Sequence, residues 1–370
     1  MNASFRPALS LLVVAGSILG AGCVTTPPSP VNIPAATREV WASTTSSFGR
    51  LETLATTTTP AVVSDARLIH RVPVSYAHEL IASANLDVPP GASAWIEARL
   101  LGRENASGVT VEQTQWFTLA SFGERSAAGG GAVKDGDVYV DVDTLKFPPR
   151  YRHAEVRVRS SAPGVVVARL DVTVSSPALR TTLPDTDALC NDGSPLLRGL
   201  DLRVPFLSQR TSKKELSGRL CSPTSLAMVL NFHGVACDVE SVAAAALDPQ
   251  HDLYGNWPRN IQSAYERGVE GMLTRFDSWQ EVERTLADGL PIIASIFVEE
   301  GQLRGAPYSS TDGHLIVIRG MDDKGDLLVN DPAAGTPETG MLTYRRSDME
   351  TVWLGNTKGT AYVLYGKAAR

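Results

Sequence analysis

The segment LCSPTSLAMVLNFHG, residues 220–234, places one of the four cysteines of the chain where a helix is predicted to begin. Ser222 can cap this helix, Pro223 suits its first turn, and Gly234 is a typical stop signal. The unpaired backbone N–H groups of a helix start favour an anion, so they lower the pKa of a thiol and increase its nucleophilic thiolate form. Packing alone would accept Ala or Val at this position. We therefore predict that Cys221 is a nucleophile.

A nucleophilic cysteine needs a base, and the base needs an orienting group. His314 opens the predicted strand HLIVIRGM directly after the turn STDG, so we expect its imidazole at a strand end. Asp331 ends the next predicted strand, DLLVNDP, and adjacent antiparallel strands can bring these two side chains together. Asn330 competes with Asp331 for the orienting role, although it should face the opposite side of a regular strand.

The oxyanion that forms during acyl transfer needs a hydrogen-bond donor. Gln209, in the segment VPFLSQ, is an uncharged amide that could supply it. Each of these four residues also has a simpler interpretation. These are a packed core thiol for Cys221, a turn-capping imidazole for His314, a turn carboxylate before Pro332 for Asp331, and a surface amide for Gln209.

Residues 200–370 are predicted to form an α+β domain with an antiparallel sheet, because helical segments come first and strands follow. Besides the helix that follows Cys221, the predicted helices are VESVAAAAL, NIQSAYERG and SWQEVERTLADG. The predicted strands are 291–298, 314–321, 326–332 and 361–366.

Residues 39–180 have mostly a two-residue periodicity, as in AEVRVRS, VVVARLDVTVS and VYVDVDTL, with turn residues between the segments. This pattern predicts an antiparallel β-sandwich of jelly-roll type. Residues 181–199 lose the periodicity and are predicted to be a linker, and the Pro/Thr-rich residues 24–38 are predicted to be a tether.

Residues 1–23 are typical of a signal peptide, because Arg6 precedes an apolar stretch that is too short to span a membrane. The small residues end at Cys23, as in bacterial lipoprotein signals, although Gly20 occupies the position where a bulky residue is usual. We expect an extracytoplasmic protein whose only membrane contact is a lipid on Cys23, or otherwise a secreted or periplasmic one. An oxidising compartment would allow Cys190 and Cys237 to form a disulfide.

The composition excludes several classes of partner. The chain has 370 residues, a net charge of -6 and no long run of Lys or Arg, which argues against a nucleic-acid partner. No dinucleotide or P-loop glycine pattern is present. His251, Asp248 and Asp252 lack the spacing of a metal site, so we predict neither a metal nor an organic cofactor.

Five ordered segments resemble one known family: VPFLSQ, CSPTSLAMVLNFHG, GNWPRNIQSAYERG, DGHLIVIRGMDDKGDLLVNDPAAG and GTAYVLYG. They are similar to the papain-like cysteine peptidases of family thirty-nine, which are related to the bacteriocin-processing double-glycine leader peptidases, and more narrowly to the stand-alone secreted bacterial type. The resemblance implies a papain-like fold over residues 200–370, with Cys221 as nucleophile, His314 as base, Asp331 as orienting acid and Gln209 as oxyanion donor. The preceding region resembles, more loosely, the β-sandwich of those proteins.

The predicted reaction is hydrolysis of a peptide bond in a peptide or protein substrate. Trp257 and Tyr308 lie in predicted loops and are candidate substrate contacts, although a tryptophan beneath a loop is equally often a core anchor. The same residues would serve a cell-wall peptide amidase or an acyltransferase. The remaining alternative is a non-catalytic module that binds a peptide or glycan, with the β-sandwich contacting the cell wall.

Overall fold

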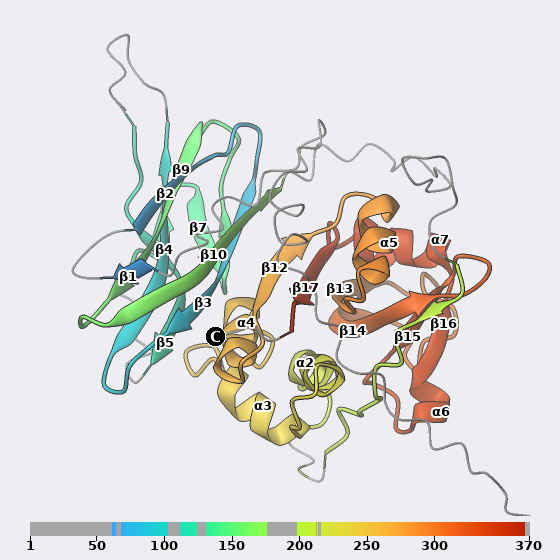
Figure 1. The fold of residues 1–370 in the computed structure, drawn as a ribbon. Helices are drawn as coiled ribbons and strands as arrows, with labels where there is room; N and C mark the ends of the chain where they lie inside the picture. Colours follow the sequence, from blue (N-terminus) through green and yellow to red (C-terminus); the bar gives the residue numbers. More distant parts are fainter. Residues whose placement is uncertain are drawn as a thin grey trace, which may run out of the picture. The chain divides into compact units, whose positions relative to one another are not determined.

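The computed structural model describes residues 61–63, 68–102, 112–123, 131–175, 198–211, 213 and 216–366 (Figure 1). The predicted signal peptide, the tether and most of the predicted linker lie outside these residues. Cys23 and Cys190 also lie outside them, so lipidation and the disulfide stay predictions.

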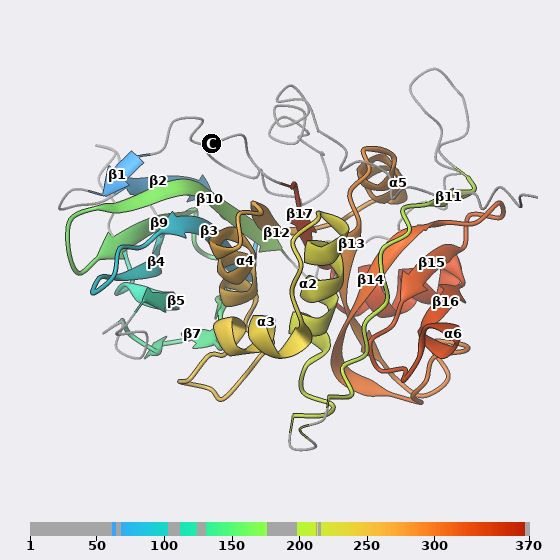
Figure 2. The ribbon, with the colours of Figure 1, turned by 60° about the horizontal axis from the view of Figure 1, so that its bottom comes forward.

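The amino-terminal strands form two antiparallel sheets that enclose a shared apolar core (Figures 1 and 2). The six-stranded sheet has the order β1-β10-β3-β8-β7-β6, and the four-stranded sheet has the order β2-β9-β4-β5. Alternating apolar residues of both sheets fill the core, as the two-residue periodicity predicts. The strands are β1 Ala61–Val63, β2 Leu68–Pro73, β3 Glu79–Asp87, β4 Ser93–Leu101, β5 Phe117–Gly123, β6 Lys134–Asp135, β7 Val138–Asp141, β8 Thr144–Lys146, β9 His153–Ser160 and β10 Val165–Ser175.

The segment VYVDVDTL forms a hairpin, whereas its alternation predicted a single strand. β7 and β8 pair with each other, and Val142 and Asp143 make the turn between them. Val142 has a φ of 57°, which is unfavourable for a β-branched residue. Because valine is rare in such turns, nothing in the sequence indicated that the alternating segment is interrupted here. The hairpin places Asp143 Oδ2 2.8 Å from the backbone nitrogen of Trp257, where it accepts a hydrogen bond.

The carboxy-terminal region contains a seven-stranded antiparallel sheet in the order β12-β17-β13-β14-β15-β16, with β11 paired to β14. Alternate residues of β13 face opposite sides of the sheet. Ile293 joins the apolar cluster beneath α2 and α4, and Ile292 and Ala294 join the cluster beneath α5 and η2. The strands are β11 Leu200–Asp201, β12 Gly271–Arg275, β13 Ile292–Val298, β14 Thr311–Met321, β15 Leu327–Asn330, β16 Met341–Tyr344 and β17 Thr360–Leu364.

The helices all belong to this carboxy-terminal region among the residues that the structure describes. They are α2 Cys221–Phe232, α3 Val239–Ala246, α4 Trp257–Glu266, α5 Trp279–Ala287, α6 Pro337–Gly340, α7 Arg346–Met349 and the π-helix η2 Glu350–Gly355. None of the helices in the described ranges is long and apolar enough to cross a membrane.

Helix α2 begins at Cys221, and Leu220 occupies its N-cap position without a side-chain cap bond. The prediction that Ser222 caps the helix was wrong. Ser222 lies buried in the first turn, and its Oγ is 3.1 Å from the hydroxyl of Tyr362 on β17. The serine hydroxyl therefore ties the start of the helix to the sheet.

Strand β12 is an edge strand whose outer backbone groups bind side chains of the amino-terminal region. Asn85 Nδ2 donates to Gly271 O at 2.8 Å, and Asn85 Oδ1 accepts from Gly271 N at 3.1 Å. Leu273 N donates to Ser83 Oγ at 3.0 Å, and Leu273 O accepts from Thr173 Oγ1 at 3.3 Å. These side chains complete the hydrogen bonds that an added strand would otherwise make, so the edge is covered.

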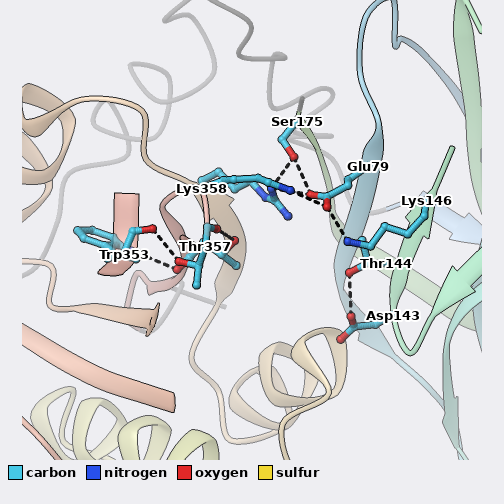
Figure 3. A network of polar contacts seen from close by, with 10 residues as sticks. Glu79, Asp143, Thr144, Lys146, Ser175, Trp353, Thr357 and Lys358 are labelled. Atoms are coloured by element: carbon cyan, nitrogen blue, oxygen red, sulfur yellow. Dashed lines mark hydrogen bonds and ion pairs between the residues drawn. The ribbon is translucent and has the colours of Figure 1, made fainter. Parts of the chain in front are cut away.

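The buried carboxylate of Glu79, the first residue of β3, binds cations from both regions (Figure 3). Glu79 Oε1 lies 2.5 Å from Lys146 Nζ and 2.6 Å from Lys358 Nζ, and Glu79 Oε2 lies 3.0 Å from Arg275 Nη1. Ser175 Oγ donates to Glu79 Oε2 at 3.1 Å. Lys146 comes from the amino-terminal sheet, whereas Arg275 and Lys358 come from the carboxy-terminal region. One carboxylate thus neutralises cations from both.

We expect Glu79→Gln to lower the free energy of unfolding by about 3 kcal/mol near neutral pH, because it removes the charge that balances three cations. Burial opposes ionisation of Glu79, but the surrounding cations outweigh it and lower its pKa in the folded protein. The carboxylate therefore stabilises the fold above its unfolded pKa of about 4.3, and that contribution declines as the pH falls below this value. Urea unfolding at a series of pH values measures both effects.

Glu300→Gln is the matched control, because Glu300 is an exposed carboxylate. It should leave the pH dependence of unfolding unchanged, whereas Glu79→Gln should flatten the acidic decline. Equal acidic declines in the wild type and Glu79→Gln would contradict the role given to this carboxylate.

Candidate active site

Cys221 occupies the first turn of α2 and is half-buried. The helix is fixed to the neighbouring strand by Ser225, whose Oγ donates to Leu315 O on β14 at 2.9 Å. The residue before this acceptor is His314, and the interaction of its imidazole with the thiol lowers the pKa of Cys221. The local sequence therefore places the thiol where the helix start meets β14.

His314 lies inside β14 and does not open it as predicted. The strand starts at Thr311, which pairs with Val298, and an irregularity in the pairing precedes the pair formed by His314 and Ile296. The His314 side chain is buried at 5% exposure. Its ring nitrogen Nε2 is 2.7 Å from Asp331 Oδ1, which leaves Nδ1 for the thiol.

The register of β14 and β15 explains why Asp331 meets His314. Val317 pairs with Asn330, so Asp331 follows on the side of the sheet that His314 also faces. Asn330 faces the other way, and its Nδ2 donates to Val204 O at 2.9 Å. The structure therefore brings the aspartate to the histidine and places the competing asparagine in a different contact.

The carboxylate of Asp331 is completely buried and accepts hydrogen bonds at both oxygens. Oδ1 receives the bond from His314 and one from Ala333 N at 3.0 Å. Oδ2 receives bonds from the hydroxyls of Tyr308, at 2.9 Å, and Tyr344, at 2.7 Å. These four donors replace the water that a carboxylate loses on burial.

The electrostatics of the site favour an ion pair. Burial opposes ionisation of Cys221, but the hydrogen bond to His314 and the charge of that imidazole outweigh burial and lower the pKa of the thiol. Burial also opposes a charge on His314, yet its bonds to Asp331 and Cys221 raise its pKa to about 10. The pKa of Asp331 is lowered despite its burial, chiefly by His314. These shifts favour a thiolate and an imidazolium beside an ionised carboxylate.

Gln209 lies next to the segment that follows Asp331. Its backbone nitrogen donates to Pro332 O at 2.9 Å, and the neighbouring Ser208 Oγ donates to Ala334 O at 2.5 Å. The Gln209 side chain is buried, and its Oε1 has no hydrogen-bond partner among the described residues. The unpartnered atom is an acceptor, whereas an oxyanion needs the Nε2 donor, so the oxyanion role of Gln209 stays a prediction.

The two predicted substrate contacts have other partners in the structure. Trp257 is the first residue of α4, where it packs half-buried against the apolar cluster beneath α2, and its substrate contact stays a prediction. Tyr308 binds Asp331 and packs the edge of its ring against His314, with the ring centroids 5.1 Å apart. No sequence pattern indicated Tyr344, because its contact with Asp331 depends on the pairing of β15 with β16.

The remaining cysteine and histidine candidates lie apart from this cluster of contacts. Cys237 is a free thiol within the described structure, and its predicted partner Cys190 lies outside it. His251 Nδ1 lies 2.8 Å from Asp248 Oδ2, and Asn256 Nδ2 donates to the same oxygen at 3.0 Å. Among the described residues, no group of three or more His, Cys, Asp or Glu side chains could hold a metal ion.

Comparison with known proteins finds one family profile that matches part of the chain. Residues 201–361 match the sequence profile of the family described as Peptidase_C39 like family. This match includes Gln209, Cys221, His314 and Asp331. Among curated proteins, none matches the chain significantly.

Three similar solved structures cover less than half of this chain. A double glycine motif protease from an AMS/PCAT transporter, solved with its leader peptide, is 19% identical over 46% of this chain and 95% of its own, with a TM-score of 0.30. A C39-like peptidase from Bacillus anthracis is 17% identical over 46% of this chain and 99% of its own, with a TM-score of 0.35. The peptidase domain of Streptococcus ComA is 16% identical over 44% of this chain and 99% of its own, with a TM-score of 0.31.

The ion pair predicts how Cys221 reacts with iodoacetamide. In the wild type, labelling should begin well below the ordinary thiol pKa of about 8.5 and change again as His314 loses its proton at high pH. In His314→Gln, burial of the thiol is no longer offset by an imidazolium, so labelling should move to higher pH and slow at least tenfold near neutral pH, with roughly tenfold corresponding to one pKa unit. Peptide mass spectrometry after timed labelling measures this for each cysteine.

Glutamine keeps an amide donor for Asp331, and a thermal melt checks that the variant is folded. After reduction of any disulfide, Cys237 serves as an internal reference, because burial raises the pKa of its thiol. Its labelling should be the same in both proteins. If the Cys221 profile were also the same in both, the thiol and imidazole would not form the ion pair.

Proposed function

We propose that this protein hydrolyses peptide bonds with Cys221 as its nucleophile, a proposal supported by the match of residues 201–361 to the Peptidase_C39 like family. The observation that carries the proposal is the hydrogen bond between His314 Nε2 and Asp331 Oδ1, at 2.7 Å, beside the helix that begins at Cys221. Ser225 Oγ of that helix donates to Leu315 O, next to His314, at 2.9 Å, and the imidazole of His314 lowers the pKa of the Cys221 thiol. A nucleophile, a base and an orienting group are thus within reach of each other.

In the proposed acylation step, the Cys221 thiolate attacks the carbonyl carbon of the scissile bond and the carbonyl electrons move to oxygen. The amide N–H of Gln209 donates to this oxyanion. When the oxyanion collapses, the C–N bond breaks and His314 Nδ1 gives its proton to the leaving amine. The product is a thioester between Cys221 and the acyl part of the substrate.

Deacylation runs the same proton path in reverse. Neutral His314 takes a proton from a water molecule as the oxygen attacks the thioester carbonyl, and Gln209 again donates to the oxyanion. Breaking the C–S bond releases a carboxylic acid and restores the thiolate beside an imidazolium. Asp331 holds the imidazole in the tautomer and orientation that both steps require.

The same acylation and deacylation steps would also serve two other reactions. They would cleave an amide bond in a cell-wall peptide, or they would transfer the acyl group to an amine that replaces water. A sugar would bind the amino-terminal region by stacking on an exposed aromatic ring. Arginine guanidinium groups already lie over two tryptophan rings at the four-stranded sheet and would compete with such a sugar. Arg159 lies 4.1 Å from the ring centroid of Trp95, and Arg157 lies 3.8 Å from that of Trp116. No contact of the described residues singles out a glycan as the substrate or partner.

We expect the wild-type protein to cleave members of a proteome-derived peptide library and Cys221→Ala to cleave none. The alanine variant loses the only nucleophile of the proposed mechanism, so new peptide termini should disappear completely. Mass spectrometry in ¹⁸O water measures hydrolysis, because each new carboxylate gains the label. If labelled products form from wall muropeptides but not from the library, the protein is an amidase. If the products are joined to an added amine, it is a transferase. If neither library peptides, muropeptides nor an added amine gives a product, the proposal is wrong.

Gln209→Ala is the matched variant for the oxyanion role. Iodoacetamide labelling forms no oxyanion, so the labelling profile of Cys221 should not change. The kcat for a cleaved library peptide should fall by roughly a hundredfold to a thousandfold. Loss of both properties would indicate a damaged site and not a missing oxyanion donor.

The amino-terminal sequence supports export as part of the proposed function, because residues 8–19 are apolar and small residues precede Cys23. We expect the full chain, expressed in a Gram-negative host, to incorporate labelled palmitate and to sediment with membranes. Cys23→Ser should remove the label. Cys237→Ser is the control and should retain it, and palmitate-free wild-type protein would contradict lipidation.

A further inference from the structure

We infer that Tyr308 and Tyr344 are positioning residues of the active site, which hold the Asp331 carboxylate in the orientation that serves His314. This inference rests on the proposed function. Both hydroxyls donate to the same oxygen, Oδ2, at 2.9 Å from Tyr308 and 2.7 Å from Tyr344. The other oxygen, Oδ1, is thereby left to His314 and to Ala333 N.

The arrangement fixes the plane of the carboxylate. A carboxylate that is bound at one oxygen alone can rotate about its Cβ–Cγ bond and lose the alignment with the imidazole. Two donors at Oδ2 and two at Oδ1 oppose this rotation from both ends. Because Asp331 is completely buried, no water replaces a missing donor without a rearrangement of the core.

The two tyrosines come from separate elements. Tyr344 ends β16 and is completely buried in the apolar cluster that also contains Trp353 and Met349. Tyr308 lies in the segment between β13 and β14, and this segment is anchored by Arg304, whose Nε donates to Asp348 Oδ2 at 2.9 Å. The position of this segment therefore decides whether Asp331 receives its fourth hydrogen bond.

The hydroxyls also affect the charge of the site. Three titratable side chains face the Asp331 carboxylate: His314 on β14, Tyr344 on β16 and Tyr308 in the segment before β14. On its other side, His314 faces Cys221 on α2. Hydrogen-bond donors favour the ionised form of a buried carboxylate. An ionised and aligned Asp331 stabilises the imidazolium, which stabilises the thiolate. Loss of the donors should therefore raise the pKa of the Cys221 thiol.

The test is iodoacetamide labelling of Cys221 against pH in the full chain with Tyr308→Phe, Tyr344→Phe and both changes. Phenylalanine keeps the rings and removes only the hydroxyls. In the double variant, the acidic limb of the labelling profile should move up by about one pH unit, a tenfold slower reaction on that limb. Each single variant should move it by less. Tyr139→Phe is the control, because Tyr139 is exposed on β7.

A second set of variants separates positioning from structural support. In an Asp331→Asn background, the tyrosine changes should not shift the acidic limb of the Cys221 labelling profile any further. The hydroxyls are proposed to act through the Asp331 carboxylate, and this variant has none. A lower melting temperature with an unmoved limb would assign the tyrosines a structural role and overturn the inference. A shift of the same size in the Asp331→Asn background would also overturn it.

Labelling needs no substrate, so the two hypotheses can fail separately. If Cys221 of the wild type titrates as an ordinary thiol, the proposed function loses its nucleophile. If the wild type shows the lowered thiol pKa and the double tyrosine variant has the same profile, the proposed function stands and the positioning role is wrong.

Discussion

The geometry of the candidate site depends on the burial of one carboxylate. Asp331 has no exposed surface, so the chain must supply each hydrogen bond that water would otherwise make. It does so from β14, β16, the turn after β15 and the segment before β14. Each of these elements is consequently fixed relative to Asp331, and His314 is oriented by the same contact that satisfies the carboxylate. The requirement to solvate a buried charge therefore also aligns the base.

The amino-terminal region affects the other half of the site. Its side chains complete the outer hydrogen bonds of Leu273 on β12, and Leu273 pairs with Tyr362 on β17. Tyr362 in turn contacts Ser222, the residue after Cys221. Polar side chains, and not another strand, therefore cover the edge strand β12. Its neighbour β17 holds the start of α2, the helix that carries Cys221. Loss of these contacts would expose an edge with unpaired backbone groups.

Local signals made part of this arrangement predictable. Pro223 in the first turn and Gly234 after the last turn indicated helix α2, although Ser222 does not cap it. The two-residue periodicity of strands places Asp331 and not Asn330 on the side of His314. The missed features depend on distant partners. Tyr344 reaches Asp331 through strand pairing, and the hydroxyl of Ser222 binds the sheet instead of the helix backbone. The antiparallel sheets were predicted, whereas the short strand β12 was not, because its outer hydrogen bonds go to side chains far away in the sequence.

Two sets of hydrogen bonds thus meet at the contact between thiol and imidazole. One passes from the amino-terminal sheets through β12, β17 and Ser222 to α2, and it fixes Cys221. The other passes from Tyr308 and Tyr344 through Asp331, and it fixes His314. The nucleophile and the base are held by different elements, which Ser225 joins through its bond to Leu315 O, so an error in either set changes their separation. Since proton transfer requires heavy atoms within about 3 Å, both sets are needed before the thiol can ionise against its partner.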